Sequence, residues 1–147
     1  MTDQDNNNLL NNVVISMAHS LLQYIAEAAA WVQISAEGLE EQVRVLAARQ
    51  RQDVSELADL LIEREYSIDF GTYPTEYTDL QFLSLEKLMS SLRHGQASVV
   101  GEISDTLAVL KEVGDSEAVE MLSAIEIREQ EIATALQDLS SELQATA

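Results

Sequence analysis

The chain has 147 residues, no cysteine, and 26 acidic against eight basic side chains, which gives it a formal charge of −18. That length suits a single domain (residues 1–147) with a sizeable core, and the lack of cysteine excludes disulfides and thiolate metal sites. The charge disfavours binding to nucleic acids and anionic membranes. No apolar run is long enough to span a bilayer, and the polar residues 1–8, which we expect to be disordered, lack the basic residues of a signal peptide. We therefore expect a cytoplasmic protein.

The first half of the chain predicts two long helices, because only one proline and five glycines interrupt a sequence rich in Ala, Leu, Glu and Gln. The first should span residues 8–36 and the second residues 39–65, on either side of Gly38. Apolar residues recur at spacings of four and three in the first helix: Leu10, Val14, Met17, Leu21, Tyr24, Ala28 and Trp31. In the second helix, Gln50 and Asp53 interrupt the corresponding stripe, so polar side chains are expected on its core face.

Residues 66–78 contain Gly71, Pro74 and four aromatic residues, a composition that predicts an ordered crossover. Two further helices should follow, over residues 79–113 and 116–144, with Gly114 ending the third and Asp115 or Ser116 capping the fourth. Short connections make the first and last helix pairs antiparallel hairpins, whereas the crossover is long enough to run the length of a bundle. The expected fold is an all-α antiparallel four-helix bundle with a long crossover between its second and third helices.

Residues equally far from a hairpin turn lie level on its two helices, which predicts a polar layer across the bundle. Counting from Gly38 places Glu27 level with Gln50, and counting from Gly114 places Glu102 level with Glu126. All four lie about twelve residues, roughly 18 Å, from their turns at the helical rise of 1.5 Å per residue. We therefore expect one mid-bundle layer with contributions from all four helices.

The hairpin spacing and the crossover resemble the ferritin-like superfamily over nearly the whole chain, and residues 47–88 are similar to a bacterial branch of it. Many members of this superfamily hold a di-iron or di-manganese site, which uses one Glu from each of two helices and Glu-x-x-His from each of the other two. The resemblance gives ligand roles to Glu27 and Glu102. Its paired motifs are altered to Gln50 with Asp53 and to Glu126 with Glu129, and both metal-binding histidines are missing.

Two interpretations of this layer follow. In one, the di-metal site is degenerate, no cofactor is bound, and hydrogen bonds from Gln50, Gln96 and Tyr24 satisfy the buried acids. In the other, an all-carboxylate site holds Mn, Fe, Mg or Ca, since hard cations prefer oxygen ligands. Its candidate metal ligands are Glu27, Asp53, Glu102, Glu126 and Glu129.

The remaining features of the sequence point to a protein–protein interface and not to a catalytic site. His19 and His94 fall off the main stripes, which indicates boundary positions, and no nucleotide-binding or nucleophile motif is present. The first helix carries apolar residues around much of its circumference, Val13, Leu22 and Ile25 among them, which predicts a homodimer that packs through this helix.

Three functional classes remain open. The first is a non-catalytic bundle of unknown biological role that acts through its surfaces or in an assembly, and the second is a divergent metal-carboxylate oxidase or metal-storage protein. The third is a small-molecule binder with the aromatic crossover as its lid.

Overall fold

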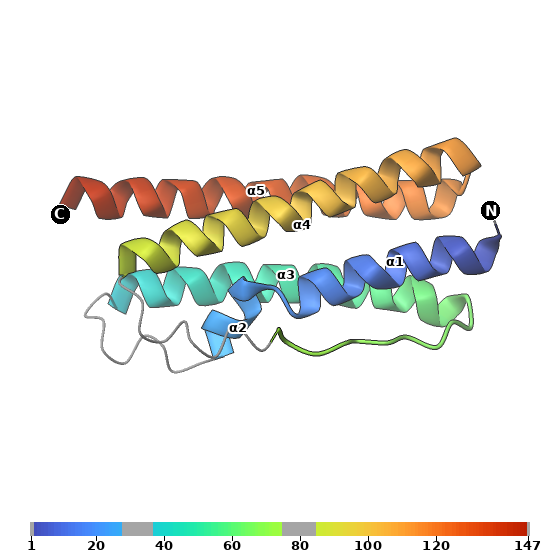
Figure 1. The fold of residues 1–147 in the computed structure, drawn as a ribbon, viewed down its shortest axis with the longest axis horizontal. Coiled ribbons are helices and arrows are strands. Elements are labelled where there is room, and N and C mark those ends of the chain that lie inside the picture. Colours follow the sequence, from blue (N-terminus) through green and yellow to red (C-terminus); the bar gives the residue numbers. More distant parts are fainter. Residues whose placement is uncertain (1, 28–36, 75–84, 147) are drawn as a thin grey trace.

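The computed structural model of this protein describes residues 2–27, 37–74 and 85–146. Its helices, in chain order, are α1 (Asp3–Ala18), α2 (Leu21–Glu27), α3 (Glu37–Glu63), α4 (Leu85–Val113) and α5 (Ser116–Thr146). Together α1 and α2 form one arm of a four-helix bundle, and α3, α4 and α5 form the other three (Figure 1). The predicted all-α four-helix bundle is confirmed.

The crossover gives the bundle its topology. The segment after α3 returns along the bundle beside α1 before α4 begins, so that α3 and α4 run in the same direction (Figure 1). The α4–α5 connection is short: Gly114 has a φ of +80°, and the N–H groups of Gly114 and Asp115 both donate to Leu110 O, at 3.0 and 3.1 Å. Asp115 then accepts from Ala118 N and caps α5. The predicted C′ glycine and helix cap are both present.

The first arm differs from the predicted continuous helix over residues 8–36, because it breaks after Ala18. His19 leaves the helical conformation with φ −119° and ψ 31°. The Ser20 hydroxyl accepts from Gln23 N at 3.3 Å, so Ser20 caps a new helix, α2. Residues 28–36 lie outside the described residues, and with them Ala28 and Trp31 of the predicted stripe. Because of this break, the residues of the first arm that lie level with a given residue of α3 differ from those of one continuous helix.

The polar start of the chain forms a helix, which corrects the expectation of disorder over residues 1–8. Thr2 and Asp5 make a capping box: Asp5 N donates to the Thr2 hydroxyl, and Thr2 N donates to the Asp5 carboxylate at 2.9 Å. Asn6 and Asn7 are buried in the bundle end. Capping and tertiary hydrogen bonds thus order a segment whose composition alone suggests a tail.

Asparagines on α1 hold the crossover in place. Asn11 donates to Asp69 O and accepts from Asp69 N, both at 3.0 Å, so its side-chain amide pairs with the backbone as another strand would. One turn earlier, the Tyr66 hydroxyl donates to Asn8 at 2.6 Å. Further along, Gly71 lies directly on Ile15. The crossover therefore covers one face of α1.

Replacing Gly71 by alanine is expected to destabilise the protein by about 1–3 kcal/mol. Gly71 has a φ of +68°, and a Cβ atom there would lie 2.9 Å from Ile15 Cγ2. Gly101→Ala is the matched control: Gly101 is helical with nothing within 4 Å of the added carbon, so alanine should stabilise by about 1 kcal/mol. Urea unfolding of both variants measures the difference, and equal stabilities would show that the crossover does not contact α1 in this way.

The residues chosen for a dimer interface are buried inside one chain. Val13 and Ile25 are fully buried, and Leu22 is 2% exposed. These three side chains therefore offer no surface to a second copy. Of the described residues, Val45 and Ile62 on α3 and Ile127 on α5 are among the exposed large apolar side chains.

The apolar core consists of two clusters, one at each end of the bundle. The first joins α1 to the later part of α3 and the α4–α5 turn, with Met17, Leu57 and Ile103 among its members. The second joins α2 to the start of α3 and the far end of α5, and includes Leu22 and Leu46. Polar side chains occupy the level between the two clusters. None of the described helices is long and apolar enough to cross a membrane.

Candidate functional site

A buried polar layer crosses the middle of the bundle. Its side chains are 0–6% exposed and come from all four arms: Ser20, Gln23, Gln50, Asp53, Gln96 and Glu129. Gln50, Asp53 and Glu129 were predicted at this level, with Gln96 as a hydrogen-bonding partner for the buried acids. Because buried polar groups are costly unless they are hydrogen-bonded, the partners of each group define what the layer can do.

Gln50 is the centre of the layer, and every hydrogen-bonding position of its side-chain amide is used. Its Nε2 donates to Glu129 Oε1 at 2.7 Å and to Gln96 Oε1 at 3.1 Å. Its Oε1 accepts from the Ser20 hydroxyl at 2.7 Å and from Gln23 Nε2 at 3.0 Å. A primary amide has two donor hydrogens and two acceptor lone pairs. Gln50 is thus saturated by partners from three other arms.

Two further glutamines extend the network around this centre. Gln96 Nε2 donates both to Glu129 Oε1 at 3.1 Å and to the Glu129 backbone carbonyl at 3.0 Å. Gln23 Nε2 also donates to Ala47 O at 2.8 Å, and Arg51 donates to Gln23 Oε1 at 3.1 Å. The donors and acceptors of the layer therefore form one connected system that holds each amide in a single orientation.

Asp53 and Glu129 are the two carboxyl groups of the layer, and they have different partners. Asp53 Oδ1 accepts from Arg128 Nε at 2.6 Å, and the same guanidinium reaches Glu56. Burial alone would lower the pKa of Arg128, but Asp53 and Glu56 together raise it. The second oxygens, Asp53 Oδ2 and Glu129 Oε2, are buried and have no hydrogen-bond partner among the described residues.

A proton on Glu129 accounts for both of these oxygens. Burial, followed by the neighbouring Asp53 carboxyl group, raises the pKa of Glu129 from 4.5 to about 8, although Gln50 and Gln96 act in the opposite direction. A protonated Glu129 that donates to the Asp53 carboxylate gives each second oxygen a partner. With this proton, the two carboxyl groups share one negative charge beside the Arg128 guanidinium.

The structure brings together only two of the five predicted metal ligands. Asp53 and Glu129 meet in the layer, whereas Glu27 is exposed at the end of α2. Glu102 is half-buried and accepts a hydrogen bond from the Ser16 hydroxyl outside the layer, and Glu126 is half-buried on α5. Over residues 2–27, 37–74 and 85–146, no three His, Cys, Asp or Glu residues converge in a way that could hold a metal ion.

The register error has a clear cause in the first arm. Counting from Gly38 assumed one continuous helix and placed Glu27 opposite Gln50, but the side chains that contact Gln50 are Ser20 and Gln23. The sequence did contain a signal, because Ser20-Leu-Leu-Gln23 matches the Ser-x-x-Gln pattern of a helix start. A helix start at Ser20 predicts Gln23, and not Glu27, as the residue of the first arm that lies level with Gln50.

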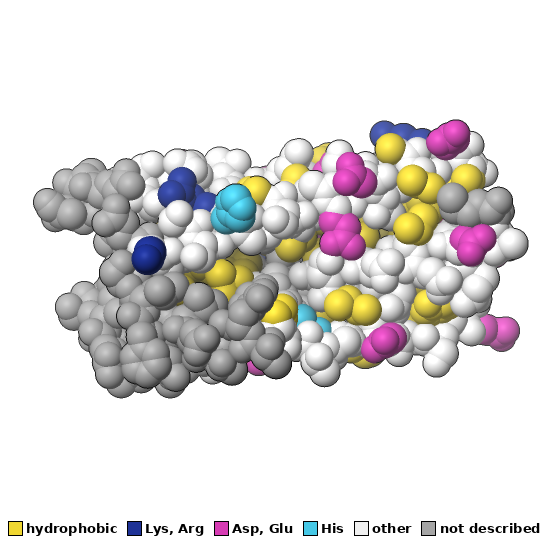
Figure 2. Space-filling model, viewed as in Figure 1, with side chains coloured by type: hydrophobic (Ala, Val, Ile, Leu, Met, Phe, Trp, Pro, Cys, Tyr) yellow, Lys and Arg dark blue, Asp and Glu magenta, His cyan; other side chains and the backbone are white. Residues whose placement is uncertain are grey.

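A groove of about 680 Å³ opens between α1 and α4, and it contains both histidines. We call it the α1–α4 groove; its polar lining includes Ser16, His19, Ser91, His94, Ser98 and Glu102. Figure 2 shows this side of the molecule hollowed between the two helices. The His19 ring packs edge-on against Tyr73 of the crossover, with centroids 4.5 Å apart, and His94 is exposed. The boundary positions predicted for the histidines are confirmed.

The crossover aromatics line the bundle and do not form a closed lid in the described part of the chain. Tyr66 packs against the first core cluster, Tyr73 lies between His19 and Tyr24, and Phe70 is 50% exposed. Tyr77 lies outside the described residues. The crossover contributes Thr72 and Pro74 to the α1–α4 groove.

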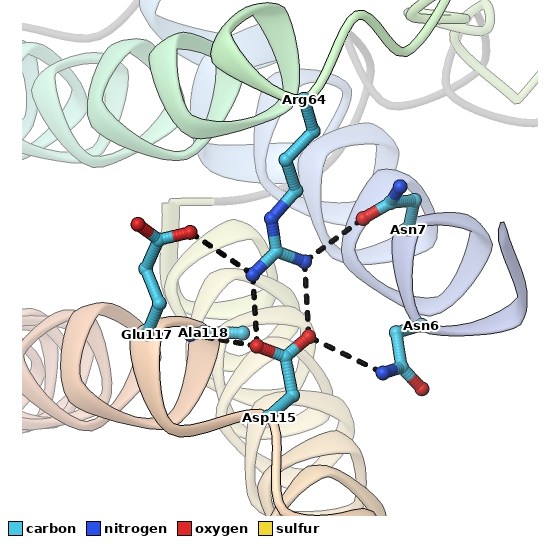
Figure 3. A network of polar contacts seen from close by, with 6 residues as sticks. All are labelled: Asn6, Asn7, Arg64, Asp115, Glu117 and Ala118. Atoms are coloured by element: carbon cyan, nitrogen blue, oxygen red, sulfur yellow. Dashed lines mark hydrogen bonds and ion pairs between the residues drawn. The ribbon is translucent and has the colours of Figure 1, made fainter. Parts of the chain in front are cut away.

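A second polar cluster closes the bundle end that holds the α4–α5 turn (Figure 3). Arg64, directly after α3, makes two hydrogen bonds to Asp115, at 2.8 and 2.9 Å, and also reaches Asn7 and Glu117. Asn6 donates to Asp115 at 3.2 Å. The hydrogen bond from Arg64 lowers the pKa of Asp115. This cluster joins three segments of the chain, so its role is structural.

Comparison with known proteins identifies the family. The family model described as the ferritin-like domain matches residues 7–146. The chain belongs to this ferritin-like family. No curated protein matches the sequence.

Several solved ferritin structures share the fold at low sequence identity. A humanized archaeal ferritin superposes with a TM-score of 0.85 at 15% identity, covering 100% of this chain and 88% of that one. An open-pore ferritin from the archaeon Archaeoglobus fulgidus gives 0.81 at 15% identity, covering 99% and 88%. BfrA from M. tuberculosis gives 0.75 at 16% identity, covering 99% and 86%. At such identities, these similarities establish the ferritin-like fold alone.

The residues of the layer do not fit a ferritin-like di-metal centre. Such a centre takes a Glu from each of two helices and Glu-x-x-His from each of the other two. The layer has Gln23, Gln96 and the pair Gln50-x-x-Asp53 on three arms, so amides and not glutamate carboxylates predominate on these arms. A cation needs oxygen or nitrogen lone pairs, whereas the two Gln50 amide hydrogens point at Gln96 and Glu129.

Proposed function

We propose that this chain is a non-catalytic ferritin-like bundle protein with a degenerate di-metal site, which acts through its surfaces or as part of an assembly. The observation that carries the proposal is the saturated Gln50 amide, fully buried and bonded to Ser20, Gln23, Gln96 and Glu129. A metal ion could enter this level only by breaking several of those bonds. Hydrogen bonding replaces metal coordination as the force that holds the four arms in register.

The alternative is a divergent carboxylate protein, an oxidase or a metal store, with Mn, Fe, Mg or Ca bound to the carboxylates of the layer. The unpartnered oxygens of Asp53 and Glu129 favour it, because two buried carboxylate oxygens can bind a hard cation. Arg128 disfavours it, because its guanidinium occupies the other Asp53 oxygen at 2.6 Å. A cytoplasmic location and a homodimer stay predictions, and any dimer must use a surface other than Val13, Leu22 and Ile25.

Metal titration separates the two functions. The protein is purified without chelator, its Mn and Fe content is measured, and its melting temperature is followed as Mn²⁺ or Fe²⁺ is added. We expect no stoichiometric metal and no rise in melting temperature, because a ligand stabilises the folded state only if it binds there. Stoichiometric metal, together with a rise that saturates, would support the carboxylate protein instead.

A variant that restores carboxylates shows that the assay can detect a metal. Gln50→Glu/Gln96→Glu replaces two amides of the layer with acids, which should lower the melting temperature without metal because like charges are buried together. Added Mn²⁺ should then restore part of the loss. If this double variant were as insensitive to metal as the wild type, the layer would not be the site of the family's metal centre.

A further inference from the structure

The α1–α4 groove has a composition that the polar layer does not explain. Its volume of about 680 Å³ lies within the range of small-ligand sites. Serines and a glycine line its α4 side, at Ser91, Gly95 and Ser98. Because these side chains are short and recur at spacings of four and three, they leave a hollow along one face of α4. The break between α1 and α2 borders the same hollow at His19 and Ser20.

The polar groups of the groove are suited to accept hydrogen bonds from a ligand. Glu102 is half-buried and is oriented by the Ser16 hydroxyl, and it is the one carboxylate among the described lining residues. Ser91 and Ser98 add hydroxyl oxygens along the α4 side of the groove. No Lys or Arg occurs among those lining residues. A cationic donor is therefore the complementary ligand, and the net charge of −18 attracts it.

Apolar side chains beside these acceptors define the rest of the ligand. Ile15, Leu21 and Val99 line the groove next to the serines and Glu102. A short alkyl chain would pack on them while its charged end reaches Glu102, the usual arrangement for an amphipathic molecule. A divalent metal ion fits less well, since no three ligand side chains converge among the described residues.

We propose that the α1–α4 groove binds a primary aliphatic amine, with Glu102 pairing with the ammonium group. The serine hydroxyls of the groove accept its remaining hydrogens, and Ile15, Leu21 and Val99 hold the alkyl chain. Among the described residues, Ser20 is the one side chain of the layer that also lines the groove, and its hydroxyl is already bonded to Gln50, so the amine site stands whether or not the layer binds metal. Free small amines and lysine side chains share this chemistry.

Pentylamine is the probe, because it carries one charge and a five-carbon chain. Titration of the full chain, followed by backbone amide NMR, is expected to show saturable shifts at Gly95 and Ser98 with a millimolar or tighter Kd. Pentan-1-ol, which lacks the charge, should bind at least about tenfold more weakly, since a charge-assisted hydrogen bond is worth more than 1.4 kcal/mol. Nα-acetyl-lysine amide tests the lysine source: binding tighter than that of pentylamine would assign the groove to a lysine side chain.

Two charge-matched variants show whether Glu102 holds the amine. Glu102→Gln should weaken pentylamine binding about tenfold or more. Glu112→Gln removes the same charge from an exposed position of α4 outside the groove and should leave the Kd unchanged. Circular dichroism checks that both variants fold. Equal Kd values in the two variants, or no saturable shifts in the wild type, would overturn the proposal.

Discussion

Glu129→Gln is expected to make the protein more stable than the wild type above about pH 8 and to change its stability little near pH 5. Glutamine keeps the shape of a protonated glutamic acid, and its Oε1 can still accept from Gln50 and Gln96. Its Nε2 can donate to Asp53 in place of the carboxyl proton. The variant therefore keeps the hydrogen bonds of the layer and removes its titration.

The raised pKa of Glu129 decides whether stability rises or falls with pH. The folded protein raises the pKa of Glu129 from 4.5 to about 8. Glu129 therefore contributes stability that is fully present below about pH 4.5 and is lost as the pH rises through 8. Since each pKa unit corresponds to about 1.4 kcal/mol, the loss between pH 5 and 9 is on the order of 2–4 kcal/mol.

Urea unfolding at a series of pH values measures this loss. The wild type should lose stability toward pH 9, while Glu129→Gln should not show that loss. Glu131→Gln, two positions along α5 and exposed, is the control and should follow the wild type. Parallel pH profiles for wild type and Glu129→Gln would mean that Glu129 is ionised in the folded state.

Asp115→Ala is expected to destabilise the protein by about 2–4 kcal/mol. The substitution removes both hydrogen bonds to Arg64, the bond from Asn6 and the cap of α5. Arg64, with 18% of its side chain exposed, would lose its closest anion. Thermal and urea unfolding measure the lost stability. The first turns of α1 should also be held less firmly, because Asn6 loses its hydrogen bond to Asp115.

Glu117→Gln serves as the control for this cluster. Glu117 also contacts Arg64, at 3.2 Å, but 64% of its side chain is exposed, so its loss should cost less than about 0.5 kcal/mol. The pKa of Asp115 is lowered by Arg64, so its contribution is present above 3.8 and is lost as the pH falls through the lower folded value. If Asp115→Ala and Glu117→Gln lost similar amounts of stability, the effect would come from the general attraction of Arg64 to nearby negative charge. The paired hydrogen bonds between Arg64 and Asp115 would then add little.

Much of the fold could be predicted from periodicity and punctuation. Leu10, Val14 and Met17 of the predicted stripe are buried as expected, because a period near 3.6 places them on one face of α1. Gly114 ended a helix as predicted, since it adopts a positive φ. The break at His19 and the order at residues 3–8 have local cap signals at Ser20 and Thr2, but the partners that complete them, Gln50 and Arg64, lie far away in the sequence.

The candidate site was predicted in part. Gln50, Asp53 and Glu129 were placed correctly because they interrupt apolar stripes, which is a local signal. Glu27 was placed wrongly at the level of Gln50, because that inference needed an unbroken helix of known length on both sides of Gly38. Hydrogen-bond direction is not encoded in spacing at all: that the Gln50 amide donates to Glu129 and accepts from Ser20 follows only from the packed structure.

The central claim is that hydrogen-bonded amides occupy the place of a metal centre. Anomalous diffraction from crystals grown with excess Fe²⁺ or Mn²⁺ tests it most directly. We expect no anomalous peak between Gln50, Asp53 and Glu129, with the Gln50 amide still bonded to its four partners. A strong peak within bonding distance of Asp53 and Glu129 oxygens, with the Gln50 side chain turned away, would contradict the claim.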